Sequence, residues 1–195
     1  MSITIPTYVT KWKFTIEKIN LFDDRCRFTP TLCERSRCMP VLSNGLLYCV
    51  SAEGYIYALD AQTGSEQWHF KAAGSIFVQP VVSDGLVYIS SYQKSVFYAL
   101  DAKTGLERWK FKAKEMNSRS KNSVFFSPSP SSPIVVNGVV YFGTGHQYFF
   151  ALDSKTGVEK WRFKTNHSSL APPTIINDII YNASDNSTIY VASDN

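Results

Sequence analysis

Apolar residues along this chain gather in short runs of β-branched and aromatic side chains, and polar turn residues separate the runs. Leu86-Val87-Tyr88-Ile89 is one such run, and Asp84-Gly85 stands directly before it. Runs of this kind are typical of buried strands, whereas a helix needs apolar residues three and four positions apart over a longer stretch. The pattern therefore predicts an all-β protein.

A nine-residue pattern of two apolar runs occurs four times along the chain. The copies begin at Pro40, Pro80, Pro133 and Pro173, and they end at Tyr48, Tyr88, Tyr141 and Tyr181. Asn-Gly or Asp-Gly joins the two runs in three copies, and these dipeptides tolerate the positive φ angles of a tight hairpin turn. Asp178 replaces the glycine in the fourth copy, so we expect a weaker turn there.

A second pattern, Ala-x-Asp-x-x-x-Gly-x-x-x-Trp, follows each of the first three copies. It is complete at Ala58, Asp60, Gly64 and Trp68, at Ala99, Asp101, Gly105 and Trp109, and at Ala151, Asp153, Gly157 and Trp161. We expect a strand to end at each Ala-Leu-Asp, the Thr-Gly to reverse the chain, and Trp-x-Phe to lie on the next strand. Each unit then holds four strands. The four prolines are 40, 53 and 40 residues apart, which is close to the size of a propeller blade.

These repeats resemble the tryptophan-docking repeats of the pyrroloquinoline quinone (PQQ)-like β-propellers, a family that includes quinoprotein dehydrogenases and the outer-membrane assembly lipoprotein. The resemblance covers about residues 40–193. It implies one propeller domain over residues 1–195, with blades at about 40–72, 80–113 and 133–165. It also implies that each tryptophan packs between the alanine of its own blade and the peptide near the glycine of a neighbouring blade. The docking residues are therefore expected to hold adjacent blades together.

The two ends of the chain carry the parts of one further blade. Residues 173–195 contain its first three strands, and residues 8–16 contain Trp12-Lys13-Phe14, which repeats Trp109-Lys110-Phe111. Tyr8 stands where the motif has glycine, so this match is partial. We expect the ends to share a blade, because an unpaired strand edge invites aggregation.

About four blades per chain result from this count, whereas the resembling families close with eight. Three arrangements stay open. Two chains that exchange terminal strands form an eight-bladed homodimeric ring, one chain closes a small four-bladed ring, or the chain is a fragment of a longer protein.

Composition and charge restrict the function only loosely. The 195 residues, 44% of them hydrophobic, suit one well-buried domain or a few repeats. A net charge of +4 is too small to indicate nucleic-acid binding without a concentrated basic face. No apolar run approaches the roughly 18 residues of a membrane span, and no signal peptide is visible. We expect a cytoplasmic protein if Met1 is the native start and a periplasmic one otherwise.

The two longest connections, residues 19–39 and 114–132, are candidate partner-binding loops, since loops on a rigid scaffold often carry function. The basic residues there that would contact an acidic protein are Arg25, Arg35, Arg37, Arg119 and Lys121. The alternative is an ordinary solvated surface, which the mixed charge of the first loop favours.

No reaction centre is recognisable in the sequence. The histidines accompany no catalytic triad or nucleophile elbow, and the spacing of Cys26, Cys33 and Cys38 lacks the close pairs of a zinc site. The resemblance to quinoprotein dehydrogenases implies a vicinal disulfide, a calcium site and a catalytic aspartate, but no adjacent Cys-Cys pair occurs. We predict a non-catalytic, protein-binding scaffold without a cofactor. A PQQ-dependent dehydrogenase with calcium, or a fragment of one, is the alternative.

Overall fold

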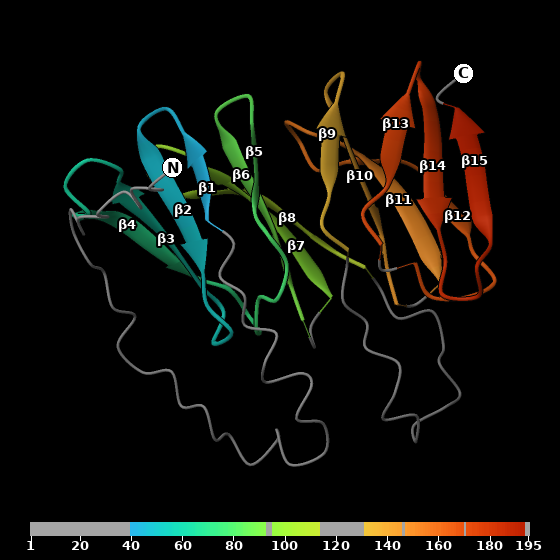
Figure 1. Ribbon diagram of the computed structural model, residues 1–195, viewed down its shortest axis with the longest axis horizontal. Coiled ribbons are helices and arrows are strands. Elements are labelled where there is room, and N and C mark those ends of the chain that lie inside the picture. The colour runs from blue at the N-terminus through green and yellow to red at the C-terminus, as the bar shows by residue number, and fades with distance from the viewer. Residues whose placement is uncertain (1–39, 93–94, 114–130, 146, 170, 194–195) are drawn as a thin grey trace, which may run out of the picture.

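The computed structural model describes residues 40–92, 95–113, 131–145, 147–169 and 171–193. These residues form antiparallel strands in four separate sheets, which follow one another in chain order and lie side by side (Figure 1). The predicted all-β class is therefore correct. The exchanged strand predicted within residues 8–16 lies outside the described residues.

Each of the first three sheets has four strands in sequential order. Sheet 1 contains β1 (Val41–Ser43), β2 (Leu46–Val50), β3 (Tyr55–Asp60) and β4 (Glu66–Lys71). Sheet 2 contains β5 (Val81–Ser83), β6 (Leu86–Ser91), β7 (Val96–Asp101) and β8 (Glu107–Lys112). Sheet 3 contains β9 (Ile134–Val136), β10 (Val139–Gly143), β11 (Tyr148–Asp153) and β12 (Glu159–Lys164). Sheet 4 has three described strands, β13 (Thr174–Ile176), β14 (Ile179–Ala183) and β15 (Ile189–Ser193).

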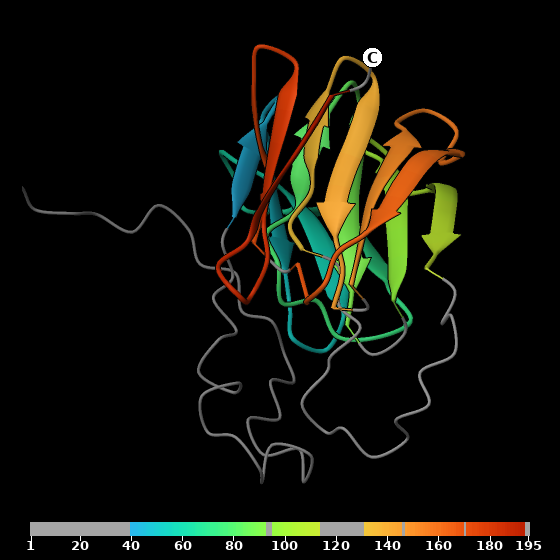
Figure 2. The same cartoon turned by 90° about the vertical axis from the view of Figure 1, so that its right-hand side faces the viewer.

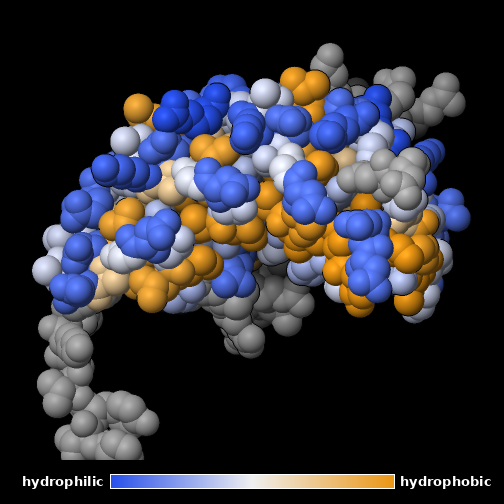
Figure 3. Space-filling model, turned by 90° about the horizontal axis from the view of Figure 1, so that it is seen from above, coloured by the Kyte–Doolittle hydropathy of each residue, from blue (hydrophilic) through white to orange (hydrophobic). Residues whose placement is uncertain are grey.

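The sheets are arranged like blades along an arc. The short first strands meet on its inner side, because β1 contacts β5 and β5 contacts β9. Figure 2 looks along the row of sheets, and Figure 3 shows from above that the row is curved. Neighbouring sheets thus stack face to face, and the two end sheets each have one face without a described neighbour.

The hairpin turns explain why the first two strands of every sheet pair in the same register. Both turn residues have positive φ in the first copy, with 49° at Asn44 and 78° at Gly45, as a two-residue type I′ turn requires. Asn177 and Asp178 adopt 51° and 61° in the fourth copy, so the turn keeps its shape without a glycine. Aspartate tolerates this left-handed region better than most side chains do.

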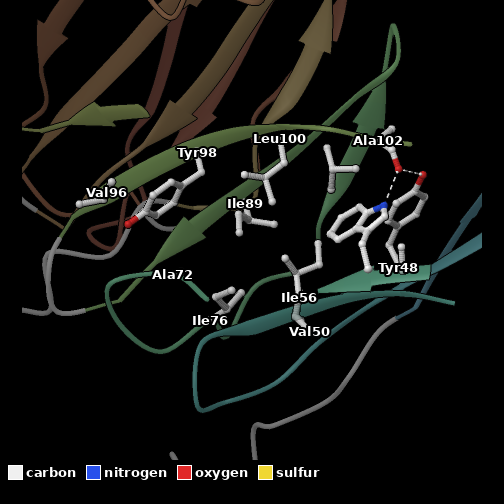
Figure 4. Packing of buried hydrophobic residues seen from close by; sticks show 13 residues of the cluster. Tyr48, Val50, Ile56, Ala72, Ile76, Ile89, Val96, Tyr98, Leu100 and Ala102 are labelled. Atoms are coloured by element: carbon white, nitrogen blue, oxygen red, sulfur yellow. Dashed lines mark hydrogen bonds between the residues drawn. The ribbon is translucent and has the colours of Figure 1, made fainter. Parts of the chain in front are cut away.

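The apolar core lies between the sheets. Figure 4 shows the cluster between sheets 1 and 2, where Tyr48 and Ile56 from one side meet Ile89 and Leu100 from the other. Equivalent clusters fill the spaces between sheets 2 and 3 and between sheets 3 and 4. Side chains alternate between the two faces of a strand, so the inner strands of sheet 2 are buried on both faces.

Among the described residues, none belongs to a helix that would be long and apolar enough to cross a membrane.

Candidate functional site

The aspartate of each repeat organises the turn that follows its strand. The Oδ1 atom of Asp60 accepts hydrogen bonds from the backbone N–H groups of Gln62 and Thr63, at 3.0 and 2.8 Å, and from the Thr63 hydroxyl at 2.9 Å. Asp101 and Asp153 make the same three contacts in sheets 2 and 3. Each turn thereby holds the next glycine at positive φ, with 74° at Gly64, 72° at Gly105 and 71° at Gly157.

The tryptophan of sheet 1 packs on the glycine of sheet 2, and that of sheet 2 packs on the glycine of sheet 3. The Trp68 ring lies so close to Gly105 that a Cβ atom there would be 2.6 Å from the indole atoms Cδ2 and Cε3. The indole Nε1–H donates to the carbonyl oxygen of Ala102 at 3.1 Å. Directly behind the ring, Ala58 pairs with Trp68 across β3 and β4. The small alanine and glycine therefore leave room for the indole, which is 9% exposed.

The junction between sheets 2 and 3 repeats this geometry. Trp109 lies against Gly157, where a Cβ atom would again be 2.6 Å from the indole atoms Cδ2 and Cε3. The Trp109 Nε1–H donates to the carbonyl oxygen of Ser154 at 2.9 Å. Trp109 is 8% exposed and pairs with Ala99. Trp161, in sheet 3, packs with Tyr141, Phe149 and Phe163.

The main-chain carbonyl oxygens of Ala102 and Ser154 each accept a second hydrogen bond, from a tyrosine hydroxyl. Tyr48 donates to the Ala102 oxygen at 3.0 Å, as the dashed line in Figure 4 shows, and Tyr88 donates to the Ser154 oxygen at 3.1 Å. One main-chain oxygen thus accepts from the indole and the phenol of the preceding sheet. The docking role of these tyrosines was not predicted from the sequence, although tyrosine recurs at the end of every hairpin repeat.

A second kind of contact ties the connections between sheets to the next sheet. The hydroxyl oxygen of Tyr98 accepts the backbone N–H of Ala73 at 3.1 Å, and that of Tyr190 accepts the N–H of Asn166 at 2.7 Å. Phe150 occupies the equivalent position in sheet 3, and its ring has no hydroxyl to offer. The connections before sheets 2 and 4 are therefore fastened by a contact that a phenylalanine cannot make.

The electrostatic environment matches a structural role for the turn carboxylates. Hydrogen bonds from Arg108, at 2.7 Å, and from Thr104 lower the pKa of Asp101 to about 2. The pKa of Asp60 is lowered chiefly by the backbone N–H of Thr63. Burial raises the pKa of Tyr88 to about 12. At neutral pH the aspartates are thus ionised acceptors and the phenol is a neutral donor.

Sheet 4 departs from the repeat in its third strand. The register places Val191 opposite Tyr181 and Ser193 opposite Ile179. In sheet 1 the corresponding partners are Ala58 opposite Tyr48, and Asp60 opposite Leu46. Valine and serine therefore replace the motif alanine and aspartate in this sheet.

Of the predicted motif residues, the structure brings Trp68 against Gly105 and Trp109 against Gly157 at the seams between sheets. Several candidates lie outside the described residues. They are the predicted partner-binding residues Arg25, Arg35, Arg37, Arg119 and Lys121, the clustered cysteines Cys26, Cys33 and Cys38, and His146. His69 lies on β4 and contacts Glu66 at 2.7 Å, on an exposed surface. Cys49 lies on β2 and is buried.

The described acidic residues do not fit a calcium ion of the kind that quinoproteins use. Asp60, Asp101 and Asp153 lie on three different sheets, and each Oδ1 atom already accepts three hydrogen bonds within its own turn. In the described ranges, no three His, Cys, Asp or Glu side chains come together as a metal-binding group.

Two family models match the chain. Residues 10–144 match the one described as outer membrane protein assembly factor BamB, and residues 115–178 match the β-propeller domain of glucose/ethanol/alcohol dehydrogenase. Serine/threonine-protein kinase AfsK of Streptomyces griseus is 28% identical over 151 residues, which cover 73% of this chain and 17% of the kinase.

Solved structures that share the fold include a BamB and a quinohemoprotein alcohol dehydrogenase. BamB from Moraxella catarrhalis is 20% identical with a TM-score of 0.63, over 76% of this chain and 43% of that chain. Quinohemoprotein alcohol dehydrogenase ADHIIG from Pseudomonas putida HK5 is 22% identical with a TM-score of 0.59, over 73% of this chain and 27% of that chain. The chain spans less than half the length of each of these relatives. These matches confirm the predicted PQQ-like propeller repeats, and the chain belongs to the β-propeller family described as outer membrane protein assembly factor BamB.

Proposed function

We propose that this chain is a non-catalytic β-propeller scaffold that binds protein. The observation that carries the proposal is the family membership, because the family is described as a factor for the assembly of an outer membrane protein. The described geometry supports it. In the first two repeats the recurring indole and phenol join neighbouring sheets, and the recurring carboxylate shapes the turn.

The proposed contact surface is formed by the basic residues of the two longest connections. Arg119 and Lys121 belong to the connection between sheets 2 and 3, and Arg25, Arg35 and Arg37 belong to the segment before sheet 1. Basic side chains on loops that leave a rigid scaffold attract an acidic protein surface and speed its association. The partner class that we propose is therefore an acidic protein.

Charge reversal in the net basic loop tests this function. We compare R119E/K121E with K103E/K155E, a control of equal charge change on exposed turn residues of sheets 2 and 3. The immobilised full chain is incubated with extract of the source cells at several salt concentrations, and retained proteins are quantified by mass spectrometry. Loss of the same proteins in the loop variant but not in the control supports the proposal. Equal retention by both variants, or no salt-sensitive retention by the native chain, contradicts it.

A second copy of the chain is a further proposed partner. Exchange of residues 8–16 between two chains would add an outer strand next to β15, which would satisfy the exposed edge of sheet 4. The exchanged segment lies outside the described residues, so its pairing stays a proposal. Deleting residues 1–16 would then destabilise sheet 4 and abolish any dimer.

A PQQ-dependent dehydrogenase is the second candidate, because residues 115–178 match the dehydrogenase propeller model. We propose that the chain acts without this cofactor. Titration with PQQ and calcium, followed by absorbance and by thermal melting, separates the two functions. An unchanged spectrum and an unchanged melting temperature support the scaffold, whereas saturable binding with thermal stabilisation supports the dehydrogenase.

A further inference from the structure

The outer strands of sheets 2 and 3 each carry a row of basic residues at alternate positions. Each row shares one face of its strand, because successive side chains point to opposite faces. The rows are Arg108, Lys110 and Lys112 on β8, and Lys160, Arg162 and Lys164 on β12. All six residues are exposed. Each strand has one carboxylate, Glu107 or Glu159, so two net positive charges remain on each. We call these two strands the basic edges.

Both basic edges are also edge strands in the structural sense. Each lies at one end of the strand order in its sheet, and none of the described strands pairs with its outer side. The basic edges lie on the convex side of the arc, because the first strands of the sheets meet on the inner side. Hydrophilic side chains line this convex side in Figure 3. The main-chain groups on the outer side of each strand are therefore open to a further strand.

The hydrogen-bond pattern of sheet 2 shows which main-chain groups point outward. The N–H of Ala113, directly after β8, donates to the carbonyl oxygen of Ser95 at 3.1 Å. In an antiparallel ladder, residue pairs that exchange hydrogen bonds alternate with pairs that do not. The pairs that contain Lys112 and Lys110 are therefore of the second kind. These two residues direct their N–H and C=O groups to the open edge.

Sheet 3 repeats this arrangement. The N–H of Thr165, directly after β12, donates to the carbonyl oxygen of Gln147 at 2.8 Å. The same alternation directs the N–H and C=O groups of Lys164 and Arg162 to the open edge. On both basic edges, the residues that offer main-chain hydrogen bonds are thus the ones that carry the cations. Among the described residues, neither Lys112 nor Lys164 has an ion-pair partner.

Sheet 1 lacks this combination. The residues at the corresponding positions of β4 are His69 and Lys71. His69 contacts Glu66 at 2.7 Å, and the Lys71 ammonium group lies over the Tyr55 ring, 4.0 Å from its centroid. Both side chains are thus engaged within their own sheet. The combination of an open edge with an unpaired cation is therefore a property of β8 and β12, and not of every outer strand.

We propose that each basic edge binds an extended acidic segment of a partner protein, which adds to the sheet as a fifth strand. Such a segment pairs through its main chain, and the side chains on one of its faces give specificity. Carboxylates at alternate positions then lie opposite the cations, with Cβ atoms about 4.5–5.5 Å apart. Lysines on an edge also keep two like edges from pairing. This contact rests on the proposed function and deepens it, because it names the form in which an acidic protein binds.

Fluorescence anisotropy of a short labelled peptide of alternating glutamate and threonine tests the contact on the full chain. We expect saturable binding that weakens as salt is raised, because exposed ion pairs are screened. K112E/K164E replaces an attractive cross-strand pair by a repulsive one on each edge and should raise the dissociation constant about tenfold. The matched control is K103E/K155E, which makes the same charge change at exposed turn residues of the same two sheets and keeps the native affinity.

Methylation of the peptide nitrogens separates strand addition from attraction between charges alone. The glutamates lie opposite residues that direct their main-chain groups outward, so the glutamate N–H groups form the new hydrogen bonds. A peptide methylated at its glutamate nitrogens should therefore bind about tenfold more weakly than one methylated at its threonine nitrogens, although both carry the same charge. Amide exchange at Lys110 and Lys112, followed by nuclear magnetic resonance, should slow when the unmethylated peptide binds.

Several results overturn the proposal. They are a native chain that binds no acidic peptide, equal weakening by K112E/K164E and K103E/K155E, and equal affinity for the two methylated peptides. A thymidine oligonucleotide of equal charge that competes as well as the peptide would show a general anion-binding surface instead.

The loop variant R119E/K121E separates this contact from the proposed function. We expect it to bind the peptide with native affinity, and loss of that binding would assign the peptide to the loops and overturn the basic edges. If the native chain retains proteins from the extract through its loops but binds no peptide, the proposed function stands and the strand addition fails.

Discussion

Replacing Gly105 by alanine tests whether the glycine of one sheet is the seat for the tryptophan of the preceding sheet. The added methyl group would lie 2.6 Å from two atoms of the Trp68 ring, well inside van der Waals contact. The ring cannot retreat easily, because Ala58 lies behind it and Ile56 and Val50 belong to the same packed cluster. The indole must therefore tilt away and release the Ala102 oxygen.

The expected loss of stability is the sum of three effects. Left-handed backbone at a φ of 72° costs alanine about 1–2 kcal/mol relative to glycine. Overpacking against the ring costs about 1–3 kcal/mol. Loss of the indole hydrogen bond costs about 1 kcal/mol. Since the last two effects are partly alternative, we expect G105A to lose about 3–5 kcal/mol of unfolding free energy.

G85A is the matched control. Gly85 has a similar φ of 76°, but a Cβ atom there meets no described atom within 4 Å. The control therefore incurs the backbone cost alone, about 1–2 kcal/mol. Urea unfolding followed by far-ultraviolet circular dichroism measures both variants. Equal losses in G105A and G85A would refute the assignment of Gly105 as the indole seat.

Three further variants probe the seams. W109A should lose about 3–5 kcal/mol of unfolding free energy, because it empties a buried site; an unchanged melting temperature would place the ring outside the core. The pKa of Asp101 is about 2, below its ordinary 3.8, so its stabilising effect is complete above about pH 4 and is lost as the pH falls toward 2. D101N should therefore lose less stability than the native chain across this window, and parallel pH profiles would contradict the turn role. Asn182 is 1% exposed, and its Nδ2 finds no acceptor among the described residues. S169A/N182I, which removes this amide together with the Ser169 hydroxyl that donates to its Oδ1 at 2.6 Å, should match or exceed native stability by up to about 2 kcal/mol, and a clear loss in urea unfolding would show that the amide is satisfied.

The strands and hairpins were predictable because they depend on local chemistry. Alternating β-branched and aromatic residues, with Asn-Gly or Asp-Gly between them, specify both the pairing and the turn. The Ala-x-Asp-x-x-x-Gly-x-x-x-Trp spacing marks the residues for which we predict a docking role, among them Trp68, which lies against Gly105. Their contribution to stability stays a prediction that the G105A and W109A variants test.

The tyrosine contacts were harder to foresee because they join residues far apart in sequence. Nothing near Tyr48 indicates that its partner is Ala102, 54 positions later. The strand register of sheet 4, however, could have been predicted from the spacing of residues in the sequence. Ala58 lies ten positions after Tyr48, and ten positions after Tyr181 is Val191, which the structure pairs with Tyr181. Because this copy lacks the motif glycine and tryptophan, its third strand was not aligned with those of the other copies from the sequence.

The acceptor at the two seams that join sheets 1, 2 and 3 is a main-chain carbonyl, and this affects how the protein tolerates sequence drift. Alanine at position 102 and serine at position 154 serve equally well, because every amino acid supplies the same oxygen. A point mutation there exchanges a side chain but leaves the acceptor in place. No single substitution removes the acceptor atom itself, whereas a substitution of the tyrosine, the tryptophan or the glycine beneath the ring removes a donor or its seat.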